Sequence, residues 1–415
     1  MFPRSSEKTI VSGPLPLRAV KTVGSVPIMN EGENNYAGFH SVHLKNWRNF
    51  GLLDTDLGRR NFIIGANATG KSNFLDALCF FRDLAKRDGG FQQAVDSRGG
   101  VRSIRSLSAR KGSDIIIGCK VVDMDGGHWE YELRFGLRDL HLQVLRERIK
   151  INSKAPVIRD TKEEDDVLRS QTWLQQVTMN KEWRGLVDTL GSIRYINPVP
   201  QIIRDNELRS ASFSDSFGRE MLERMSREGK DSQDVRLNKI ADALREAVPN
   251  LDKLKVTRDK LSGRPHIMAR FEHWRPQGAW HDEMRLSDGT LRLITILWEL
   301  QERSGPVLIE EPEMSLHPEL IAMLPGLFAR VGREKNRQVI VSTHSPDILR
   351  DPGIAPAEVK IFKSSSEGTQ VTDASAIPGV DDALRGGLLL SEMAMSQARP
   401  RIGKLSPIIQ ATSVG

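Results

Sequence analysis

Cysteine and long apolar runs are scarce in this chain. Of its 415 residues only two are cysteines, Cys79 in a helical apolar pattern and Cys119 in a strand-like one. Neither shows the spacing of a metal site, so both are expected to be reduced core thiols. The longest apolar stretch, 293–300, is too short to cross a bilayer. The first residues lack the apolar core of a secretory signal. We therefore expect a cytoplasmic protein with no membrane partner.

A large excess of one charge is also missing. Lysine plus arginine number 60 against 54 aspartates and glutamates, so the net charge is +6. This balance permits DNA as a partner without establishing it. The segment 97–112 holds cations and no acid, and a loop that contacts a DNA backbone and a solvated surface explain it equally well. Its cations are Arg98, Arg102, Arg105, Arg110 and Lys111. A lesser patch, Arg399, Arg401 and Lys404, indicates a flexible basic tail.

The strongest motif present is a glycine-rich loop of the form Gly-x-x-x-x-Gly-Lys-Ser. In such loops backbone N–H groups wrap phosphates, while the lysine and the hydroxyl reach the terminal phosphate and Mg²⁺. The apolar run 61–64 precedes the loop and helical apolar spacing follows over 74–84, so the loop leaves a buried strand and opens a helix. We predict that ATP binds here, with Lys71 on the β- and γ-phosphates and Ser72 on Mg²⁺. The predicted loop residues are Gly65, Ala66, Asn67, Ala68, Thr69, Gly70, Lys71, Ser72 and Asn73.

Two apolar strands further along end on polar side chains that suit the same chemistry. The strand 305–309 stops on Glu310 and Glu311, and the strand 338–341 runs towards His344. An α/β sheet presents catalytic groups at the carboxyl edge of its strands. We assign Glu310 to the Mg²⁺ shell, Glu311 to deprotonating the attacking water, and His344 to the γ-phosphate. Alone, such an acidic pair would be a solvated turn and such a histidine a structural residue; their place after the phosphate loop favours the functional interpretation.

A second helix start also has the character of an anion site. The segment Leu286-Ser-Asp-Gly-Thr290 precedes a strongly apolar helix, which places Ser287 and Gly289 at its N-terminus. One subunit cannot use two phosphate-binding helix ends on one nucleotide. We therefore expect this end to close over the nucleotide of a second subunit. The alternative is a helix cap, in which Ser287 and Asp288 bind nothing.

These motifs, in this order, resemble those of ABC-type ATPases, with Walker A, Q-loop, signature, Walker B and H-loop. Within that class, Glu-Glu-Pro-Glu-x-x-Leu-His-Pro over 310–318 and Ser-Thr-His-Ser-Pro over 342–346 resemble the ATPase part of overcoming-lysogenization-defect (OLD) nucleases, relatives of SMC and RecF proteins. The resemblance covers roughly residues 38 to 375. It implies an α/β P-loop NTPase with a mixed central sheet, an antiparallel side sheet and a helical subdomain. It also implies a homodimer that closes around ATP and Mg²⁺, with any higher oligomer left open.

The sequence departs from the ABC pattern at three places. Glu310 stands where most ABC proteins have aspartate, and His317 stands where the D-loop aspartate is usual. Asp288 and Thr290 replace a glycine and a glutamine of the signature. Only Ser287 and Gly289 carry over from that motif.

The resemblance also requires a Q-loop glutamine, which would couple the γ-phosphate and Mg²⁺ to movement of the helical part. We nominate Gln201, because it follows the strand-like run 192–196 and precedes a mainly helical tract. Gln92 and Gln93 compete, but they come before the expected side sheet.

The expected organisation has five parts. They are a disordered N-terminal arm (1–37), a first ATPase lobe with Walker A and the side sheet (38–200), a helical subdomain (201–285), a second lobe with signature, Walker B and H-loop (286–375), and a C-terminal extension (376–415). Strand-like runs over 114–151 with a hairpin turn at 123–127 predict the side sheet. OLD nucleases carry a C-terminal Toprim domain with a Glu and an Asp-x-Asp pair for metals. No such pattern follows Asp373, and we interpret Asp123-Met-Asp125 as turn chemistry, so the chain is not expected to be a nuclease itself.

The sequence thus predicts an ATPase that controls a DNA-directed process, in anti-phage defence or DNA repair, through a separately encoded effector such as a nuclease. Two alternatives remain open. One is the ATPase subunit of a transporter, which would need a membrane partner. The other is a nucleotide-gated sensor scaffold that hydrolyses ATP slowly.

Overall fold

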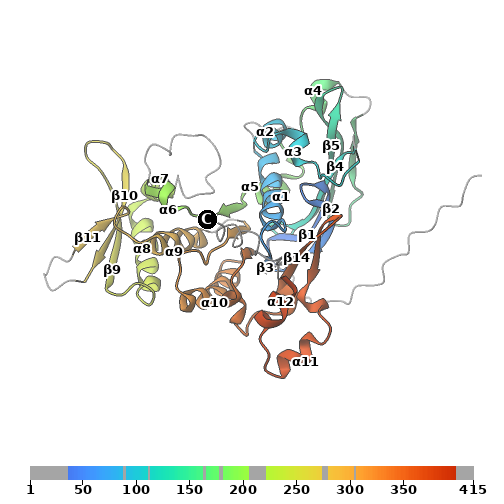
Figure 1. Cartoon of the computed structure of the whole chain (residues 1–415). Helices are drawn as coiled ribbons and strands as arrows, with labels where there is room; N and C mark the ends of the chain where they lie inside the picture. Colours follow the sequence, from blue (N-terminus) through green and yellow to red (C-terminus); the bar gives the residue numbers. More distant parts are fainter. Residues whose placement is uncertain are drawn as a thin grey trace, which may run out of the picture. The chain divides into compact units, whose positions relative to one another are not determined.

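The computed structural model describes residues 36–86, 90–110, 113–161, 165–176, 181–204, 221–272, 279–302 and 305–398 (Figure 1). Most of the expected N-terminal arm lies outside these residues. Its last two positions do not belong to an arm, because Tyr36 and Ala37 are buried. The Tyr36 hydroxyl donates a hydrogen bond of 2.5 Å to the Leu57 carbonyl, and this contact attaches the start of the described chain to the fold.

A central sheet of six strands carries the phosphate loop, the pair Glu310 and Glu311, and the turn with His344. Its order is β15-β14-β3-β13-β12-β8, with all neighbours parallel except β14 and β15. The strands are β3 (Arg60–Gly65), β8 (Arg194–Ile196), β12 (Val307–Glu310), β13 (Val339–Thr343), β14 (Val359–Ser365) and β15 (Gly368–Asp373). Strands β3, β12 and β13 are buried throughout, which explains their continuous apolar runs. Their carboxyl ends meet at one edge, since Ile64 pairs with Thr343 and Glu310 with Ser342.

The predicted side sheet is present and is larger than expected. It has the order β2-β1-β4-β5-β6-β7, and every pair is antiparallel. Its strands are β1 (Gly38–Trp47), β2 (Phe50–Asp56), β4 (Ile115–Val122), β5 (His128–Arg138), β6 (His141–Ile151) and β7 (Val157–Asp160). The turn between β4 and β5 confirms the interpretation of Asp123: its Oδ1 accepts hydrogen bonds from the backbone N–H groups of Asp125 and Gly127 at 3.0 and 2.7 Å.

Helix α1 (Lys71–Leu84) joins the phosphate loop to the side sheet. Its Phe80 and Phe81 lie 5.6 and 6.3 Å, centroid to centroid, from Phe135 and Tyr131 of β5. Both cysteines are free and buried, as predicted, and burial raises the pKa of the Cys79 thiol to about 12. Around this core lie α2 (Gly90–Asp96), α3 (Gly100–Ile104), α4 (Asp166–Arg169) and α5 (Arg184–Gly191).

The segment 201–285 is not purely helical, which corrects the expected helical subdomain. Helices α6 (Pro200–Arg204), α7 (Met221–Arg227) and α8 (Lys230–Leu244) are followed by a three-stranded antiparallel sheet. The strands are β9 (Leu251–Arg258), β10 (Pro265–Phe271) and β11 (Ala279–Asp282). This sheet buries one face only, with Ile267 and Ala269 alternating with more exposed neighbours, so its sequence has short polar-interrupted runs. The apolar helix predicted after Thr290 is α9 (Asp288–Gln301).

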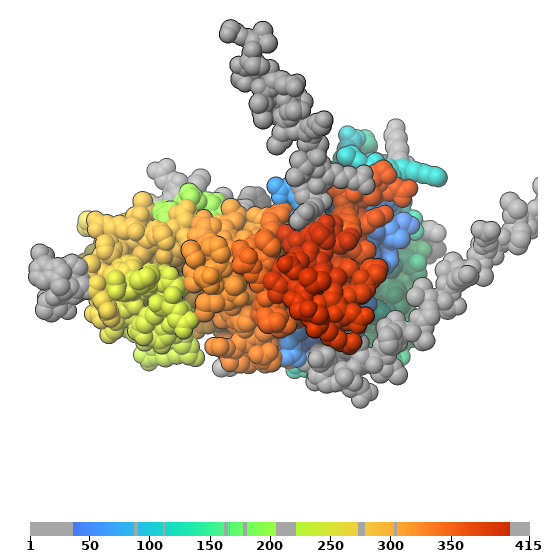
Figure 2. Space-filling view, turned by 60° about the horizontal axis from the view of Figure 1, so that its bottom comes forward, coloured from blue at the N-terminus to red at the C-terminus, as the bar shows by residue number. Residues whose placement is uncertain are grey.

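The described C-terminal residues extend the apolar core that also contains residues of α9 and β12. After α10 (Pro318–Glu334) come the 3-10 turns η4 (Pro346–Arg350), η5 (Pro356–Glu358) and η6 (Ala374–Ala376), then α11 (Val380–Arg385) and α12 (Leu390–Ala398). Helix α12 packs against η4, β14 and β3, and Figure 2 shows this last part of the fold in red against the orange preceding segment. The basic residues Arg399, Arg401 and Lys404 lie outside the described residues. No helix in the described ranges is both long and apolar enough to span a membrane.

Candidate nucleotide-binding site

The phosphate loop connects β3 to α1, and its backbone conformation requires glycine at Gly65 and Gly70. At Gly65 an added Cβ would lie 2.6 Å from both the Phe362 carbonyl oxygen and the Thr69 hydroxyl. Gly70 has φ 95° and leaves room for the side chain of Asn49. Ala68 also adopts a positive φ, 62°. Such consecutive turns form a concave nest of backbone N–H groups directly before a helix N-terminus, which is the arrangement that binds phosphates.

Lys71 is held inside this loop. Its Nζ donates hydrogen bonds to the carbonyls of Gly65 and Ala66 at 2.9 and 3.1 Å. Burial lowers the pKa of the ammonium below its ordinary value, while the charges of Glu311, Glu313 and Glu310 oppose that shift. The lysine therefore lies among three carboxylates, where an incoming phosphate finds a desolvated cation.

Glu310 ends β12 and contacts Ser72, the first hydroxyl of α1. The Ser72 Oγ donates to Glu310 Oε1. The other oxygen, Oε2, accepts from the Tyr195 hydroxyl and from Asn197 Nδ2, the latter at 3.3 Å. Burial, followed by the charge of Glu310, raises the pKa of the Tyr195 phenol well above its ordinary value, so the phenol remains a donor. The two predicted Mg²⁺ ligands are thus neighbours.

Glu311 and His344 form the third part of the cluster. The His344 Nε2 lies 2.8 Å from Glu311 Oε1, and its Nδ1 lies 3.4 Å from Lys71 Nζ. A neutral imidazole with its proton on Nε2 satisfies both contacts, because it donates to the carboxylate and accepts from the ammonium. Glu311 has φ 45°, a strained backbone for a glutamate. The sheet edge therefore brings together Lys71, Glu311 and His344 as predicted.

Glu313 supports this edge and was not predicted to act in it. Its Oε1 accepts from the Thr343 hydroxyl at 2.8 Å and from the backbone N–H groups of His344 and Ser345 at 2.7 and 3.3 Å. One carboxylate thus orients the turn that carries His344.

The signature-like residues lie elsewhere and serve their own helix. Ser287 caps α9, with its Oγ accepting from Thr290 N at 3.2 Å. Gly289 packs so closely that an added Cβ would lie 2.5 Å from the Ser315 carbonyl oxygen. Across the described residues, no hydrogen bond or ion pair joins Ser287 or Gly289 to the phosphate loop. The cap interpretation is therefore correct for Ser287 within one chain, and a role towards a second chain stays a prediction.

Gln201 is exposed and is not brought to the predicted catalytic residues. Its Nε2 donates to Asp288 Oδ2 at 3.0 Å, and Arg204 pairs with the other oxygen of Asp288 at 2.6 Å. Asn197, four residues earlier and directly after β8, contacts Glu310 instead. The competing Gln92 is bonded to the carbonyls of Leu142 and Ser170.

The basic segment 97–112 does meet acids in the fold. Arg98 pairs with Asp76 and Asp83 at 2.7 and 2.9 Å, and its guanidinium lies over the Phe80 ring. This cation is structural, since its side chain is 7% exposed. Arg102 and Arg110 are exposed, and Lys111 lies outside the described residues.

Sequence reasoning missed four polar residues of the site. Asn49, from the turn between β1 and β2, donates to the Thr69 carbonyl at 3.0 Å under the phosphate loop. Tyr195 and Asn197 hold Glu310, and Glu313 holds the His344 turn. The last three could have been found from their position in or within three residues of the carboxyl end of a parallel strand, β8 for Tyr195 and Asn197 and β12 for Glu313. Nothing in the local sequence marks Asn49.

A hollow of about 710 Å³ opens beside the phosphate loop. The loop residues Ala66 and Asn67 and the imidazole of His344 form one wall, and α12 forms the other with Ser391, Glu392 and Met395 among its lining residues. The C-terminal extension therefore borders the predicted nucleotide site.

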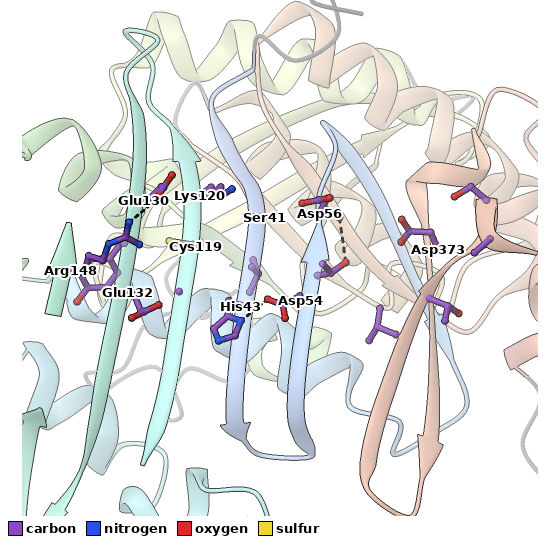
Figure 3. Close-up of a pocket in the computed structure, with 18 residues that line it drawn as sticks. Ser41, His43, Asp54, Asp56, Cys119, Lys120, Glu130, Glu132, Arg148 and Asp373 are labelled. Atoms are coloured by element: carbon purple, nitrogen blue, oxygen red, sulfur yellow. Dashed lines mark hydrogen bonds and ion pairs between the residues drawn. The ribbon is translucent and has the colours of Figure 1, made fainter. Parts of the chain in front are cut away.

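A second hollow, of about 670 Å³, lies on the face of the side sheet turned away from α1 (Figure 3). Carboxylates dominate its lining, and Arg148 there pairs with Glu130 at 3.4 Å. The lining carboxylates are Asp54, Asp56, Glu130, Glu132 and Asp373. A lining with more carboxylates than cations disfavours a triphosphate, and none of the predicted nucleotide-binding residues lines this hollow.

The fold and this edge cluster define a class: the protein has the P-loop NTPase fold with an ABC-type ATPase head. Two SMC heads share the fold. One, bound to the C-winged helix domain of ScpA, has a TM-score of 0.50 at 12% identity and covers 84% of this chain and 99% of that chain. The other, with an extended coiled coil and the C-terminal domain of ScpA, derived from Pyrococcus furiosus, has a TM-score of 0.51 at 11% identity and covers 84% and 100%.

Sequence comparison gives the family. The profile described as "AAA domain, putative AbiEii toxin, Type IV TA system" matches residues 60–350, which is more than half of the chain. The chain belongs to this family. Over 56 residues it is also 41% identical to endonuclease GajA of Bacillus cereus (strain VD045). That match covers 14% of this chain and 10% of the length of GajA.

Proposed function

We propose that the protein is an ATP hydrolase whose two copies close around ATP and Mg²⁺, and that this closure drives or gates a DNA-directed process. The observation that carries the proposal is the edge cluster, in which His344 contacts both Lys71 and Glu311 beside the bonded pair of Ser72 and Glu310. A phosphate cradle, a base and a hydrogen-bond donor at one edge are the parts that phosphoryl transfer to water needs.

Each of these side chains has a definite task when ATP binds. The Lys71 ammonium exchanges its bonds with the Gly65 and Ala66 carbonyls for phosphate oxygens, which are stronger charge-assisted acceptors. Glu311 orients the attacking water and takes its proton. His344, already turned towards that carboxylate, donates to the γ-phosphate once its Nε2–H is redirected.

The residues present fit Mg²⁺. This ion prefers oxygen ligands and in phosphate sites binds through one or two protein oxygens, substrate phosphates and water. Ser72 Oγ and Glu310 Oε1 are such oxygens and lie in contact. Tyr195 and Asn197 hold the other carboxylate oxygen, so Glu310 presents Oε1 to the hydroxyl in spite of its extra methylene. When bound, the ion neutralises charge that develops on the phosphates.

The dimer is supported by what α9 leaves free. Ser287 is exposed at the N-terminus of α9. In the described residues this helix start makes no hydrogen bond or ion pair with the phosphate loop of its own chain. A second copy in head-to-tail facing would supply the phosphate, which is favoured there by the unpaired N–H groups and the positive end of the helix dipole.

Complementation between two defective copies tests this shared site. Lys71→Ala removes the ammonium that binds the phosphates, and Ser287→Asp keeps a good helix cap while placing a negative charge against the partner's γ-phosphate. Each variant alone should hydrolyse no ATP. A mixed dimer contains one site free of both changes, so mixing should restore up to about a quarter of the parental turnover by random pairing. Ser287→Asn, which caps without charge, is the matched control. No recovery on mixing would refute the shared site.

The relatives support a proposal for the process that the ATPase serves. The short match to an endonuclease supports membership of the OLD-like group and a DNA-directed role in defence or repair. The description of the family as a toxin of a toxin–antitoxin system, and SMC heads solved with ScpA, both support a separately encoded partner. ATP turnover with and without duplex DNA, at several salt concentrations, tests the DNA step, because a DNA-stimulated enzyme loses its stimulation as salt rises. DNA-independent slow turnover would favour the sensor scaffold.

A further inference from the structure

Arg292 is a buried cation in the second turn of α9, and part of its guanidinium has no partner. The residue is 4% exposed, and its Nε and Nη1 donate to no acceptor within the described part of the chain. Burial lowers the pKa of this guanidinium below its ordinary value. Unpaired donors on a buried charge are costly, so a state of the protein that pairs them is favoured relative to this one.

A matching acceptor lies on the opposite element. The carboxylates whose charges act on Arg292 are Asp288, Glu313 and Glu311, in that order. Both oxygens of Asp288 are held by Gln201 and Arg204. Glu313 differs, because its Oε2 is buried and has no hydrogen-bond partner among the residues that the structure describes. Of these three carboxylates, it alone has a buried oxygen left to accept.

The helix geometry points Arg292 towards that carboxylate. Residues three apart share a helix face, so Arg292 lies one turn above Gly289 on the same side of α9. Gly289 packs against the Ser315 carbonyl, two residues after Glu313. The face of α9 that carries Arg292 is therefore turned to the segment 313–316.

We propose that Arg292 is a positioning residue that pairs with Glu313 Oε2 when the N-terminus of α9 engages a nucleotide. This inference rests on the proposed function and deepens it. Glu313 already holds the backbone of His344 and Ser345 through Oε1. A guanidinium on its second oxygen fixes the carboxylate, and with it the turn that presents His344 to ATP.

The pairing has a consequence for the dimer. The start of α9 engages the ATP of one site, whereas His344 of the same chain serves the other site. Arg292 and Glu313 thus connect the two sites, so that filling one prepares the other. Hydrolysis should then be cooperative in ATP, and the cooperativity should depend on this pair.

The test compares Arg292→Met, Glu313→Gln and the double variant with the parent. Each single change should lower kcat about 10-fold and bring the Hill coefficient of turnover to 1. The Kd for a fluorescent ATP analogue should change less than about 2-fold, because the phosphate loop is intact. The double variant should be no slower than either single variant, as expected for one shared interaction. Arg292→Lys should recover part of the rate and cooperativity.

A stability measurement separates this role from a structural one. Replacing an unpaired buried charge by an apolar side chain of similar size is neutral or stabilising, so Arg292→Met should keep or raise Tm while it slows turnover. Arg285→Met, an exposed arginine near the same helix start, is the matched control and should change nothing. Parental kcat and cooperativity in Arg292→Met, or a lowered Tm with additive losses in the double variant, would overturn the pairing. A parent that binds ATP without hydrolysing it would instead overturn the proposed function, and the pairing with it.

Discussion

The two halves of the predicted nucleotide site differ in how much one chain completes. At the sheet edge, Lys71, Ser72, Glu310, Glu311 and His344 are already in contact with one another or with the loop. At the start of α9, Ser287 bonds to its own helix and Gly289 packs against Ser315 and Leu316, and among the described residues neither is bonded to the phosphate loop. The first half is preorganised, so it should bind nucleotide alone. The second is an exposed helix start, which in the proposed dimer engages the nucleotide of the other chain.

The largest effect expected on this comparison comes from Lys71→Ala. The variant lacks the buried ammonium and therefore loses its charge-assisted hydrogen bonds to the phosphate oxygens. ATP affinity should fall about 100-fold or more. Isothermal titration or a fluorescent analogue measures the loss. Lys86→Ala, which removes an exposed lysine that pairs with Asp83 at 3.1 Å, is the control and should bind as the parent does. Near-parental affinity in Lys71→Ala would mean that the sheet edge is not the binding half.

The next largest effect separates chemistry from binding at the same edge. Glu311→Gln keeps an oxygen that can accept from His344 Nε2 but cannot take a proton from water. Turnover should fall about 100- to 1,000-fold while ATP binding persists. Because hydrolysis would no longer allow the ATP-bound dimer to dissociate, light scattering should detect ATP-dependent dimers. Glu319→Gln, an exposed change in the first turn of α10, is the matched control. If Glu311→Gln hydrolysed ATP at the parental rate, Glu311 would not be the general base.

The α9 half can be tested through Gly289. Its added Cβ would press on the Ser315 backbone carbonyl, which cannot rotate away as a side chain could. Gly289→Ala should therefore destabilise the fold by about 1–3 kcal/mol, visible as a lower Tm. Gly326→Ala, also in a helix but with open space at its Cβ position, should leave Tm unchanged or raise it slightly. Equal shifts for the two variants would show that α9 is not packed closely against 313–316.

The sequence predicts those parts of the fold that are marked by a local pattern, and it fails where contacts between distant residues decide the structure. A continuous apolar run next to a motif predicts four parts of the fold, and all are found where predicted. They are the phosphate loop, β12, β13 and α9. The sheet β9–β11 was missed because only one face is buried, and its strands alternate with charged residues within a tract that also contains helices. Arg98 was misread because its acids, Asp76 and Asp83, come from α1. Such pairings are set by packing between helices and leave no local pattern.

The same limit applies to the residue that follows β8, and the smallest predicted effect addresses it. Asn197 belongs to the preformed half, since it donates to Glu310, whereas Gln201 belongs to the α9 half through Asp288. Asn197→Ala removes a bond to a charged acceptor worth about 1.5 kcal/mol, so kcat should fall roughly 10-fold. Gln201→Ala removes an exposed bond to a carboxylate that Arg204 still holds, so kcat should stay within about 2-fold. Steady-state turnover at saturating ATP and Mg²⁺ decides between them. A larger loss in Gln201→Ala would restore the nominated glutamine as the switch and would mean that the α9 half moves onto the sheet edge during each cycle.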